Sequence, residues 1–401
     1  MPVVISKFFR TFLSIACCLS LIYVENPAEA SRSEPARIGV WVSVFSPENV
    51  LFSKKNADKL IDNCAACGIT DIYLQVYRSD TAYYNSALTD HAPYDKMLSE
   101  AGEDMVKYII KKAETAGIKV HAWLNLLSIA QNENANIIKK FGKGVLTTDQ
   151  YGNFSMDKNK SRELNKHFVL ENQLFLEPGD IRVKNYLTGI TAELLEKYPG
   201  LAGLHLDYIR YPAAVPFIPG SKFASHGLCY GYTPDNIRNF GAFTGLDPRS
   251  MKQSPENFWL WDEWKRDQVT SLIRSISDRS RALSPGIIIS CTVMPYIDRT
   301  YLVTFQDWIE WLKEGIADYI VAMNYTDDTK LMKMNTYSLF IPPFRKKVFI
   351  GLGAYLLKNK PRVFKSQLEF LKKVSPGGIV IFSYDELADN PEYLDYVREL
   401  K

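Results

Sequence analysis

Residues 103–125 read EDMVKYIIKKAETAGIKVHAWLN, and this stretch contains the pattern that sets the fold class. Its first part, Glu103–Ala116, places apolar residues at helical spacing, and Gly117 then stops the helix. Its second part, Lys119–Asn125, is a short apolar run that is typical of a buried strand. A helix that turns through one glycine into a strand is a repeating unit of α/β proteins.

The same alternation extends in both directions along the chain. The predicted strands are Ile38–Phe45, Asp71–Tyr77, Lys119–Asn125, Gly203–Tyr208, Gly286–Val293, Tyr319–Tyr325, Val348–Tyr355 and Gly378–Tyr384. The predicted helices are Lys54–Cys67, Glu103–Ala116, Ile181–Tyr198, Asn257–Leu283, Phe305–Glu314, a weak segment at Lys330–Leu339, Arg362–Val374 and Pro391–Leu400. Strict alternation implies a parallel sheet covered by helices, and about eight strands close into a barrel. The sequence therefore predicts an α/β fold, a (β/α)8 TIM barrel.

Three of the predicted strand-to-helix connections are long. They are Ser79–Gly102 after the second strand, Leu126–Asp180 after the third and Ile209–Glu256 after the fourth. All three belong to the face on which barrel active sites are built. We expect these long βα loops to form the walls of a cleft.

The N-terminus has the layout of a secretory signal peptide. Lys7 and Arg10 precede an apolar run from Phe12 to Val24, and Ala28–Ala30 then places small residues at alternate positions. The apolar run is shorter than the roughly 20 residues that a membrane-spanning helix needs. We predict a signal peptide over residues 1–30, with cleavage after Ala30.

Removal of that segment would leave residues 31–401 as a single barrel domain. We expect the mature protein to be exported, periplasmic or extracellular, without stable membrane insertion. A lipoprotein anchored through Cys17 or Cys18 is the alternative. Export permits disulfides, but Cys64 and Cys67 lie inside a helical pattern, which favours two small core-facing residues.

Composition places the chain among globular proteins. Of the 401 residues, 46% are hydrophobic and 23% are charged, which excludes a disordered or fibrous chain. The formal net charge of +3 is small and evenly mixed along the sequence, so nucleic acid is not an expected partner. Aromatic residues make up 13% of the chain, which suits a large ring-lined surface.

The fourth predicted strand carries the leading catalytic candidate. Side chains two apart in a strand share a face, so Leu204 and Leu206 face the helices while His205 and Asp207 point into the barrel. Asp207 ends the strand, where an inward carboxylate meets the substrate cavity. A buried charge is costly unless it is paired or functional. We predict a catalytic carboxylate, with an ion pair to Arg210 as the structural alternative.

Aromatic and polar residues gather at the other strand ends. His121 and His205 lie one layer below the expected cavity and suggest a packed polar network. Neither has an acidic residue at close ligand spacing, so we expect no metal site and no cofactor. The residues expected to bind substrate are Tyr77, Arg78, Trp123, Asn125, His205, Tyr208, Arg210, Asn324, Tyr325, Tyr355 and Tyr384. Ring faces suit sugar C–H faces, and Asn, Asp and Arg can bind vicinal hydroxyls, so the expected partner is a polysaccharide or oligosaccharide.

Six segments of the chain carry a family resemblance. They are GVWV (Gly39–Val42), DIYLQVYRSDTAYYNS (Asp71–Ser86), GIKVHAWLN (Gly117–Asn125), LHLDYIRYP (Leu204–Pro212), YIVAMNY (Tyr319–Tyr325) and GLGAY (Gly351–Tyr355). Together they resemble the glycosyl-hydrolase-like family 10, a group of exported bacterial proteins. The resemblance implies a (β/α)8 barrel that acts on glycosidic bonds of bacterial wall or surface polysaccharides, with peptidoglycan glycan strands favoured. It also marks Asp207 as the leading acidic residue.

Glycoside hydrolysis usually needs two carboxyl groups. In the wider alpha-amylase-like barrels a Glu on the fifth strand partners the Asp of the fourth, but Ile287–Pro295 contains no carboxylate. We rank Asp385 first as the partner of Asp207. The alternatives are Glu386, Asp327 and Asp80. If the substrate carries an N-acetyl group that itself attacks the anomeric carbon, one protein acid suffices.

Two other kinds of protein fit the same sequence. The first is a non-catalytic carbohydrate-binding barrel of the cell envelope, which the missing acid of the fifth strand supports. The second is a structural envelope protein whose aromatic residues serve only as core. The residues at the strand ends favour the exported glycoside hydrolase.

Overall fold

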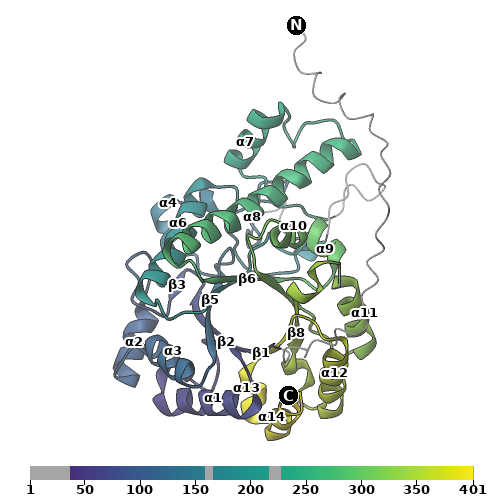
Figure 1. The fold of residues 1–401 in the computed structure, drawn as a ribbon. Helices are drawn as coiled ribbons and strands as arrows, with labels where there is room; N and C mark the ends of the chain where they lie inside the picture. The colour runs from purple at the N-terminus through teal and green to yellow at the C-terminus, as the bar shows by residue number, and fades with distance from the viewer. Residues whose placement is uncertain (1–36, 159–165, 216–226, 401) are drawn as a thin grey trace, which may run out of the picture. The chain divides into compact units, whose positions relative to one another are not determined.

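A computed structural model describes residues 37–158, 166–215 and 227–400. Its sheet has nine strands in the order β1-β9-β8-β7-β6-β5-β4-β2-β3, and a further pairing of β1 with β2 closes it into a barrel (Figure 1). The short β3 is antiparallel to β2, and the other strands pair in parallel. The strands are β1 (Arg37–Val42), β2 (Asp71–Arg78), β3 (Thr81–Ala82), β4 (Lys119–Asn125), β5 (Gly203–Asp207), β6 (Ile288–Val293), β7 (Tyr319–Met323), β8 (Val348–Gly353) and β9 (Gly378–Phe382). The predicted (β/α)8 barrel is confirmed.

Each predicted helix is present, with ends that differ by a few residues at most. These helices are α1 (Lys54–Cys67), α3 (Met105–Thr115), α6 (Ile181–Lys197), α8 (Pro255–Leu283), α10 (Trp308–Lys313), α11 (Thr329–Leu339), α12 (Pro361–Val374) and α14 (Pro391–Arg398). Further helices are α2 (Ala92–Ala101), α4 (Asn136–Phe141), α7 (Pro234–Thr244), α9 (Ile297–Leu302) and α13 (Tyr384–Asp389). Short 3₁₀ helices are η1 (Val50–Phe52), η2 (Lys143–Val145), η3 (Lys166–Phe168), η4 (Phe344–Lys347) and η5 (Ala354–Leu357).

Local signals in the sequence set the helix ends. The side chain of Ser53 accepts a hydrogen bond from the backbone N–H of Asn56 at 3.4 Å and caps the start of α1. Asp104 caps α3 in the same way through the N–H of Lys107 at 3.0 Å. Gly68, with φ of 72°, ends α1 in the left-handed conformation that glycine adopts without strain.

The barrel interior has its own aromatic core beside the larger core between strands and helices. The interior core consists of Trp41, Tyr73, Trp123, Tyr319, Val321, Phe349 and Val380. These residues alternate along their strands with residues that pack against the helices. The interior is therefore filled by side chains.

A buried charged network lies at the opposite end of the barrel, where the strands begin. Asp71 accepts hydrogen bonds from Arg37 Nε at 3.2 Å and shares one with His121 Nε2 at 2.8 Å. Burial alone would raise the pKa of Asp71, but the hydrogen bonds from His121 and Arg37 outweigh it and hold that pKa well below its usual range. This network stabilises the strand starts and takes no part in the mouth.

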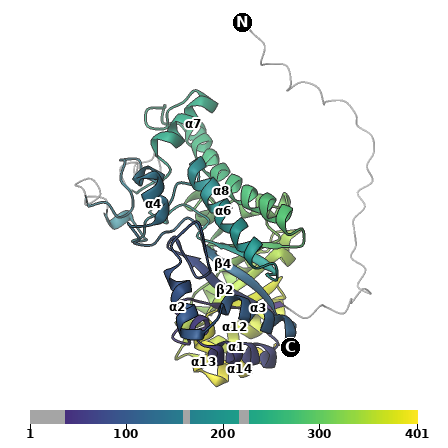
Figure 2. The ribbon, with the colours of Figure 1, turned by 90° about the vertical axis from the view of Figure 1, so that its left-hand side faces the viewer.

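The predicted long connections are present and carry extra elements. The connection after β2 contains β3 and α2, that after β4 contains α4, and that after β5 contains α7. In Figures 1 and 2, α4 and α7 lie on the side of α6 and α8, away from α1 and α14. Two of the long connections are therefore gathered beside one part of the barrel mouth.

The predicted signal peptide and the lipoprotein cysteines lie outside the described residues. Over residues 37–158, 166–215 and 227–400, no helix combines the length and the apolar character needed to cross a bilayer. Cys64 and Cys67 are buried in α1, and the Cys67 thiol donates to the carbonyl of Leu394 at 3.4 Å. Their side chains face the core, as the helical pattern predicted.

Candidate active site

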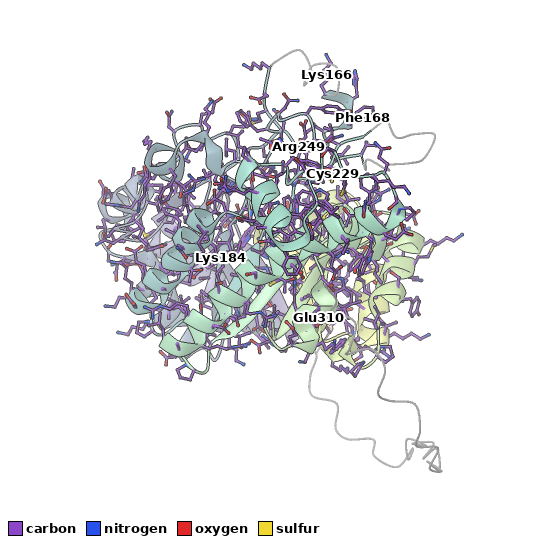
Figure 3. All side chains as sticks on the ribbon, turned by 90° about the horizontal axis from the view of Figure 1, so that it is seen from above. Lys166, Phe168, Lys184, Cys229, Arg249 and Glu310 are labelled. Atoms are coloured by element: carbon purple, nitrogen blue, oxygen red, sulfur yellow. The ribbon has the colours of Figure 1, made fainter. Side chains whose placement is uncertain are left out.

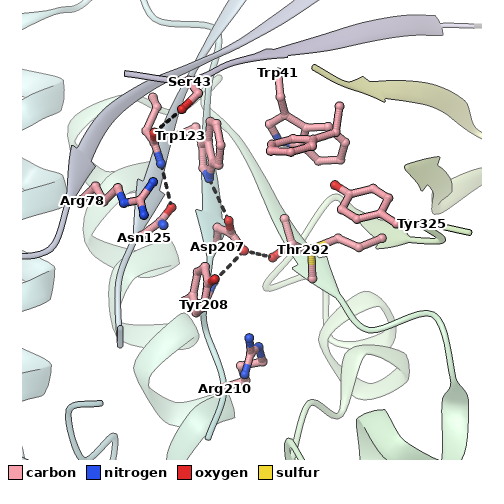
Figure 4. Close-up of a pocket in the computed structure, with 13 residues that line it drawn as sticks. Trp41, Ser43, Arg78, Trp123, Asn125, Asp207, Tyr208, Arg210, Thr292 and Tyr325 are labelled. Carbon is pink, nitrogen blue, oxygen red and sulfur yellow. Dashed lines mark hydrogen bonds between the residues drawn. The ribbon is translucent and has the colours of Figure 1, made fainter. Parts of the chain in front are cut away.

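A cavity of about 190 Å³ opens at the carboxyl ends of the strands (Figure 4). It is lined by Trp41, Ser43, Gln75, Arg78, Trp123, Asn125, Asp207, Tyr208, Arg210, Thr292, Met323, Tyr325 and Phe382. The lining residues come from seven of the barrel strands and the turns that follow them. The closed sheet thus brings together residues that are far apart in the sequence.

Asp207 is held in the cavity by three hydrogen bonds. The Trp123 indole Nε1–H donates to Oδ2 at 2.9 Å, and the backbone N–H of Tyr208 donates to Oδ1 at 2.7 Å. The Thr292 hydroxyl also donates to Oδ1, at 2.5 Å (Figure 4). Asp207 is 6% exposed and is the one carboxylate among the described lining residues. Its oxygens are fixed as acceptors, and Oδ2, with a single donor, has the more free lone pairs.

The layer beneath the cavity supports the ring of Trp41. The Trp41 Nε1–H donates to Nε2 of His205 at 3.0 Å, so Nε2 is an acceptor and the ring proton lies on Nδ1. That proton is shared with the Ser290 hydroxyl at 2.8 Å. Burial holds the pKa of His205 well below its usual value, which keeps the ring neutral. His205 therefore lies below the cavity and acts on it through Trp41.

Aromatic rings form one wall of the cavity. Tyr325 stacks on Phe382 with ring centroids 5.6 Å apart, and Trp41 meets Tyr325 edge-on at 6.3 Å. A Cβ at Gly353 would come within 3.0 Å of Tyr325 Cβ, and a Cβ at Gly351 within 3.1 Å of Trp41 Cη2. The two glycines of β8 make room for these rings, which would collide with any larger side chain there.

Amide and hydroxyl groups form the opposite wall. The Ser43 hydroxyl donates to Gln75 Oε1 at 3.2 Å, and Gln75 Nε2 donates to Asn125 Oδ1 at 3.2 Å. Beside them the guanidinium of Arg78 lies 4.3 Å from the ring centroid of Phe45. This wall offers donors and acceptors next to the ring wall, which is the arrangement that sugar hydroxyls and C–H faces require.

Arg210 forms its ion pair with Glu171, and the alternative of a pair with Asp207 is wrong. Its Nη1 and Nη2 donate to the two carboxylate oxygens at 2.8 and 2.6 Å. Burial would raise the pKa of Glu171, but the charge of Arg210 outweighs it and lowers that pKa. Glu171 also accepts the backbone N–H of Ala213 at 2.7 Å. The pair ties the connection after β4 to the connection after β5.

The structure brings seven of the sequence-predicted site residues together in the cavity. They are Arg78, Trp123, Asn125, Asp207, Tyr208, Arg210 and Tyr325. Tyr355 is 46% exposed, and its ring meets Tyr325 edge-on at 6.0 Å outside the lining set. The remaining predicted residues lie elsewhere, for reasons that differ from strand to strand.

Tyr77 points away from the cavity because β2 contains a bulge. The register with β4 shifts between Gln75 and Tyr77, so the strict alternation of faces breaks there. Gln75 and Arg78 line the cavity, whereas Tyr77 packs on the helix side and its hydroxyl donates to Asp80 at 2.8 Å.

Asn324 also faces outward, one position out of phase with the inward residues of β7. Its Nδ2 donates to the carbonyl of Met332 in α11 at 2.9 Å and to the hydroxyl of Thr336 at 3.1 Å. Met323 and Tyr325, on either side of it, line the cavity.

Tyr384 and Asp385 belong to α13 because β9 ends at Phe382. The Tyr384 hydroxyl accepts a hydrogen bond from Asn63 at 3.1 Å, on the helix side of the barrel. Asp385 accepts hydrogen bonds from the hydroxyls of Ser46 and Ser383. Neither residue is among those that line the cavity.

The other candidates for a second carboxylate are also engaged outside the cavity. Glu386 accepts from the backbone N–H of Ser383 at 3.0 Å in the capping box of α13. Asp327 pairs with Lys360 at the surface. Asp80 is buried and accepts hydrogen bonds from several protein groups, among them the hydroxyls of Tyr77, Tyr186 and Thr89.

Sequence reasoning missed six lining residues: Trp41, Ser43, Gln75, Thr292, Met323 and Phe382. The signal that could have found most of them is the same alternation that found Asp207. Trp41 and Ser43 are two apart on or just after β1, and Phe382 follows Val380 by two on β9. In the part of the chain that the structure describes, no three His, Cys, Asp or Glu side chains form a candidate metal site.

Known proteins resemble the chain in sequence and in fold. The family model described as Glycosyl hydrolase-like 10 matches residues 37–355. Glycosyl hydrolase DigH of Escherichia coli (strain K12) is 22% identical over 376 residues, which cover 84% of this chain and 77% of that protein. Glycosyl hydrolase YngK of Bacillus subtilis (strain 168) is 21% identical over 434 residues, covering 98% of this chain and 76% of that protein.

Solved structures share the barrel. The catalytic domain of β-amylase from Paenibacillus polymyxa superposes with a TM-score of 0.56 and 12% identity, covering 90% of this chain and 97% of that one. A β-galactosidase from the psychrophilic Marinomonas ef1 gives a TM-score of 0.55 and 11% identity, covering 90% and 58%. At such identities the likeness concerns the fold alone. The family model spans most of the chain, and the protein belongs to the glycosyl hydrolase-like 10 family.

Proposed function

We propose that this protein is an exported glycoside hydrolase that cleaves a bacterial cell-wall or surface polysaccharide, with the glycan strands of peptidoglycan as the favoured substrate. Asp207 is its reacting carboxylate. The observation that carries the proposal is the position of Asp207. It is the one carboxylate among the described residues that line a ring-lined cavity, and it is oriented by Trp123, Thr292 and the N–H of Tyr208. Family membership supports the same class of chemistry.

The two walls of the cavity support a sugar as the ligand. Trp41, Tyr325 and Phe382 offer ring faces and edges to sugar C–H groups. Gln75 and Asn125 offer amide groups that can form hydrogen bonds with hydroxyl or N-acetyl substituents. A sugar ring placed between the walls would lie over Asp207.

The hydrogen bonds of Asp207 determine the role that it can take. Because its oxygens accept from Trp123, Thr292 and Tyr208, Asp207 suits attack on the anomeric carbon or stabilisation of positive charge near it. Oδ2 is the reacting atom, since it has the more free lone pairs. In a substrate-assisted route the N-acetyl oxygen attacks and Asp207 stabilises the charged ring that forms.

Mass spectrometry of the products from purified glycan strands, with and without attached peptides, tests the proposal. The wild type is expected to release shorter glycans, and Asp207→Asn is expected to release none while its melting temperature stays near that of the wild type. The matched variant Asp385→Asn changes a carboxylate that does not line the cavity, and we expect it to retain activity. Loss of activity in Asp385→Asn would instead make Asp385 the partner carboxylate.

Two further measurements separate the remaining possibilities. De-N-acetylated strands are expected to resist cleavage if the substrate's own acetamide attacks, and to be cleaved if Asp207 is the nucleophile. Isothermal titration of the wild type with the same oligosaccharides measures binding independently of cleavage. Binding without any product would overturn the hydrolase proposal and favour a carbohydrate-binding barrel.

A further inference from the structure

We propose that Cys229 and Lys265 form a covalent modification site in which one oxygen atom bridges the lysine nitrogen and the cysteine sulfur. Lys265 Nζ lies 2.7 Å from Cys229 Sγ. Cys229 belongs to the connection after β5, and Lys265 belongs to α8. Figure 3 labels Cys229 beside the ribbon of α8. This site is separate from the cavity around Asp207 and does not depend on the proposed function.

The lysine nitrogen and the cysteine sulfur approach each other closely. A separation of 2.7 Å is at the lower end of the range for N–H···O hydrogen bonds, about 2.7–3.2 Å. Sulfur is a larger atom than oxygen, so an ordinary N–H···S contact would hold the two atoms farther apart. The distance between the nitrogen and the sulfur is therefore that expected for two atoms joined through one atom between them.

Lys265 is held in place beside the thiol. Its side chain is fully buried, and Nζ lies 2.9 Å from Oδ1 of Asp262 and 3.8 Å from the ring centroid of Phe305. A buried, doubly anchored amine has already lost the rotamer freedom that a surface lysine would lose on cross-linking. The reacting atoms are therefore held together at little further entropic cost.

The thiol of Cys229 is open to an oxidant. Burial raises the pKa of Cys229, and the charge of Lys265 offsets only part of this rise, so the thiolate that oxidants attack forms only as a minor fraction. Cys229 also lines a cavity of about 30 Å³, together with Asp262 and Leu302. Cys229 is partly exposed, so a small oxidant can approach the residue from solvent.

The reaction balances with dioxygen as the oxidant. The Lys265 ammonium first passes one proton to the Asp262 carboxylate with which it is paired. The resulting amine, one thiol and one O₂ then give the N–O–S bridge and one water, so that one oxygen atom enters the bridge and the other leaves as water. Sulfur and nitrogen together lose four electrons, which O₂ accepts. With hydrogen peroxide, the first equivalent forms the sulfenic acid of Cys229 and water. The second joins it to the amine of Lys265 and releases two further waters.

The bridge would join two parts of the chain that the fold holds only by non-covalent contacts. Because a cross-link restricts the unfolded chain, it is expected to raise the melting temperature of the oxidised protein. Two equivalents of a dithiol reductant, each oxidised to a disulfide, supply the four electrons needed to return the bridge to thiol, amine and water, so the rise is expected to be reversible.

Peptide mass spectrometry of the full-length protein tests the proposal. One sample is treated with hydrogen peroxide and the other with dithiothreitol, and free thiols are alkylated before digestion with trypsin. In the oxidised sample we expect peptide 223–238 to be joined to peptide 253–266, because trypsin no longer cleaves after the modified Lys265. The mass of this species equals the two reduced peptides plus one oxygen and minus two hydrogens. It is expected to disappear in the reduced sample.

A second cysteine and a substitution at Cys229 provide the controls. Cys291 is wholly buried in β6, so its peptide is expected to keep a reduced thiol in both samples. Cys229→Ser is expected to lose the joined peptide and the rise in melting temperature on oxidation. The proposal is overturned if wild-type Cys229 emerges from peroxide treatment as an unlinked thiol, or as a sulfinic or sulfonic acid on a peptide separate from Lys265.

Discussion

At the residue scale, three protein donors orient Asp207. Trp123 and the backbone of Tyr208 supply N–H groups that cannot accept, so both must donate to the carboxylate. Because these donors already hold the carboxylate in place, the cavity does not have to reorganise when charge develops on the substrate. The indole of Trp123 therefore serves two purposes, as a ring in the cavity and as the donor that aims Oδ2.

Trp123→Phe is expected to slow glycan cleavage while it keeps most of the ring surface. A hydrogen bond to a charged group contributes about 1.5–3 kcal/mol, which corresponds to a loss of about 10- to 100-fold in rate. Trp41→Phe makes the same change in the same cavity, but the donor that it removes serves His205. We expect Trp41→Phe to lower the melting temperature more and the turnover less than Trp123→Phe. Equal turnover in both variants would contradict the role given to Trp123.

For single residues, prediction from the sequence succeeded at some positions and failed at others. Asp207 and Trp123 follow from the alternation of faces along a regular strand. Tyr77 does not, because a bulge in β2 changes the phase after Gln75, and nothing in the local sequence marks that bulge. The partner of Arg210 lies 39 residues earlier, in a long connection whose path no periodicity describes.

At the element scale, β8 illustrates how a strand shapes the cavity without lining it. β8 contributes Gly351 and Gly353, which have no side chains to fill the barrel interior. The structure places the rings of Trp41 and Tyr325 in that volume. The glycines therefore determine where the ring wall stands.

Gly353→Ala is expected to displace Tyr325 and to weaken both glycan binding and turnover. The new methyl carbon would lie 3.0 Å from Tyr325 Cβ, and overpacking of this kind costs about 1–3 kcal/mol. Gly286→Ala is the matched control, because a methyl group there would meet no atom within 4 Å. Titration with an oligosaccharide and thermal unfolding measure the two effects. If both variants bind like the wild type, the wall does not depend on this glycine.

Element types could be predicted well, because helices and strands of a barrel differ in the period of their apolar residues. Element ends were harder. The eighth predicted strand runs to Tyr384, but β9 stops at Phe382 because Ser383 and Glu386 form a capping box that starts α13. Because the predicted strand was two residues too long, Tyr384 and Asp385 were expected at the mouth of the barrel.

At the scale of the whole molecule, buried titratable groups link stability to pH. Burial raises the pKa of Glu177 to about 6 from 4.5, although Tyr211, Thr147 and Gly179 donate hydrogen bonds to it. The folded protein thus binds this proton more tightly than the unfolded chain. Glu177 contributes stability below about pH 4.5, and that contribution is lost as the pH rises through 6. The difference between the pKa of Glu177 in the folded protein and in the unfolded chain corresponds to about 2 kcal/mol in the free energy of unfolding.

Two histidines act in the opposite direction. Burial lowers the pKa of His121 and of His205, so the unfolded chain takes up their protons first and stability falls as the pH drops below about 6.5. Comparison with Glu177→Gln isolates the glutamate, because the variant keeps both histidines. Urea unfolding is expected to show the wild type gaining about 2 kcal/mol relative to the variant between pH 7 and pH 4.5. A constant difference across that range would contradict the assignment.

We propose that the barrel gathers its cavity around one reacting carboxylate, Asp207. The most direct measurement is the initial rate at which new reducing ends form from purified glycan strands, in wild type and in Asp207→Asn, at strand concentrations that saturate binding. We expect the variant to bind the strands and to form reducing ends at least about 10³-fold more slowly. Formation at the wild-type rate by a folded Asp207→Asn protein would contradict it.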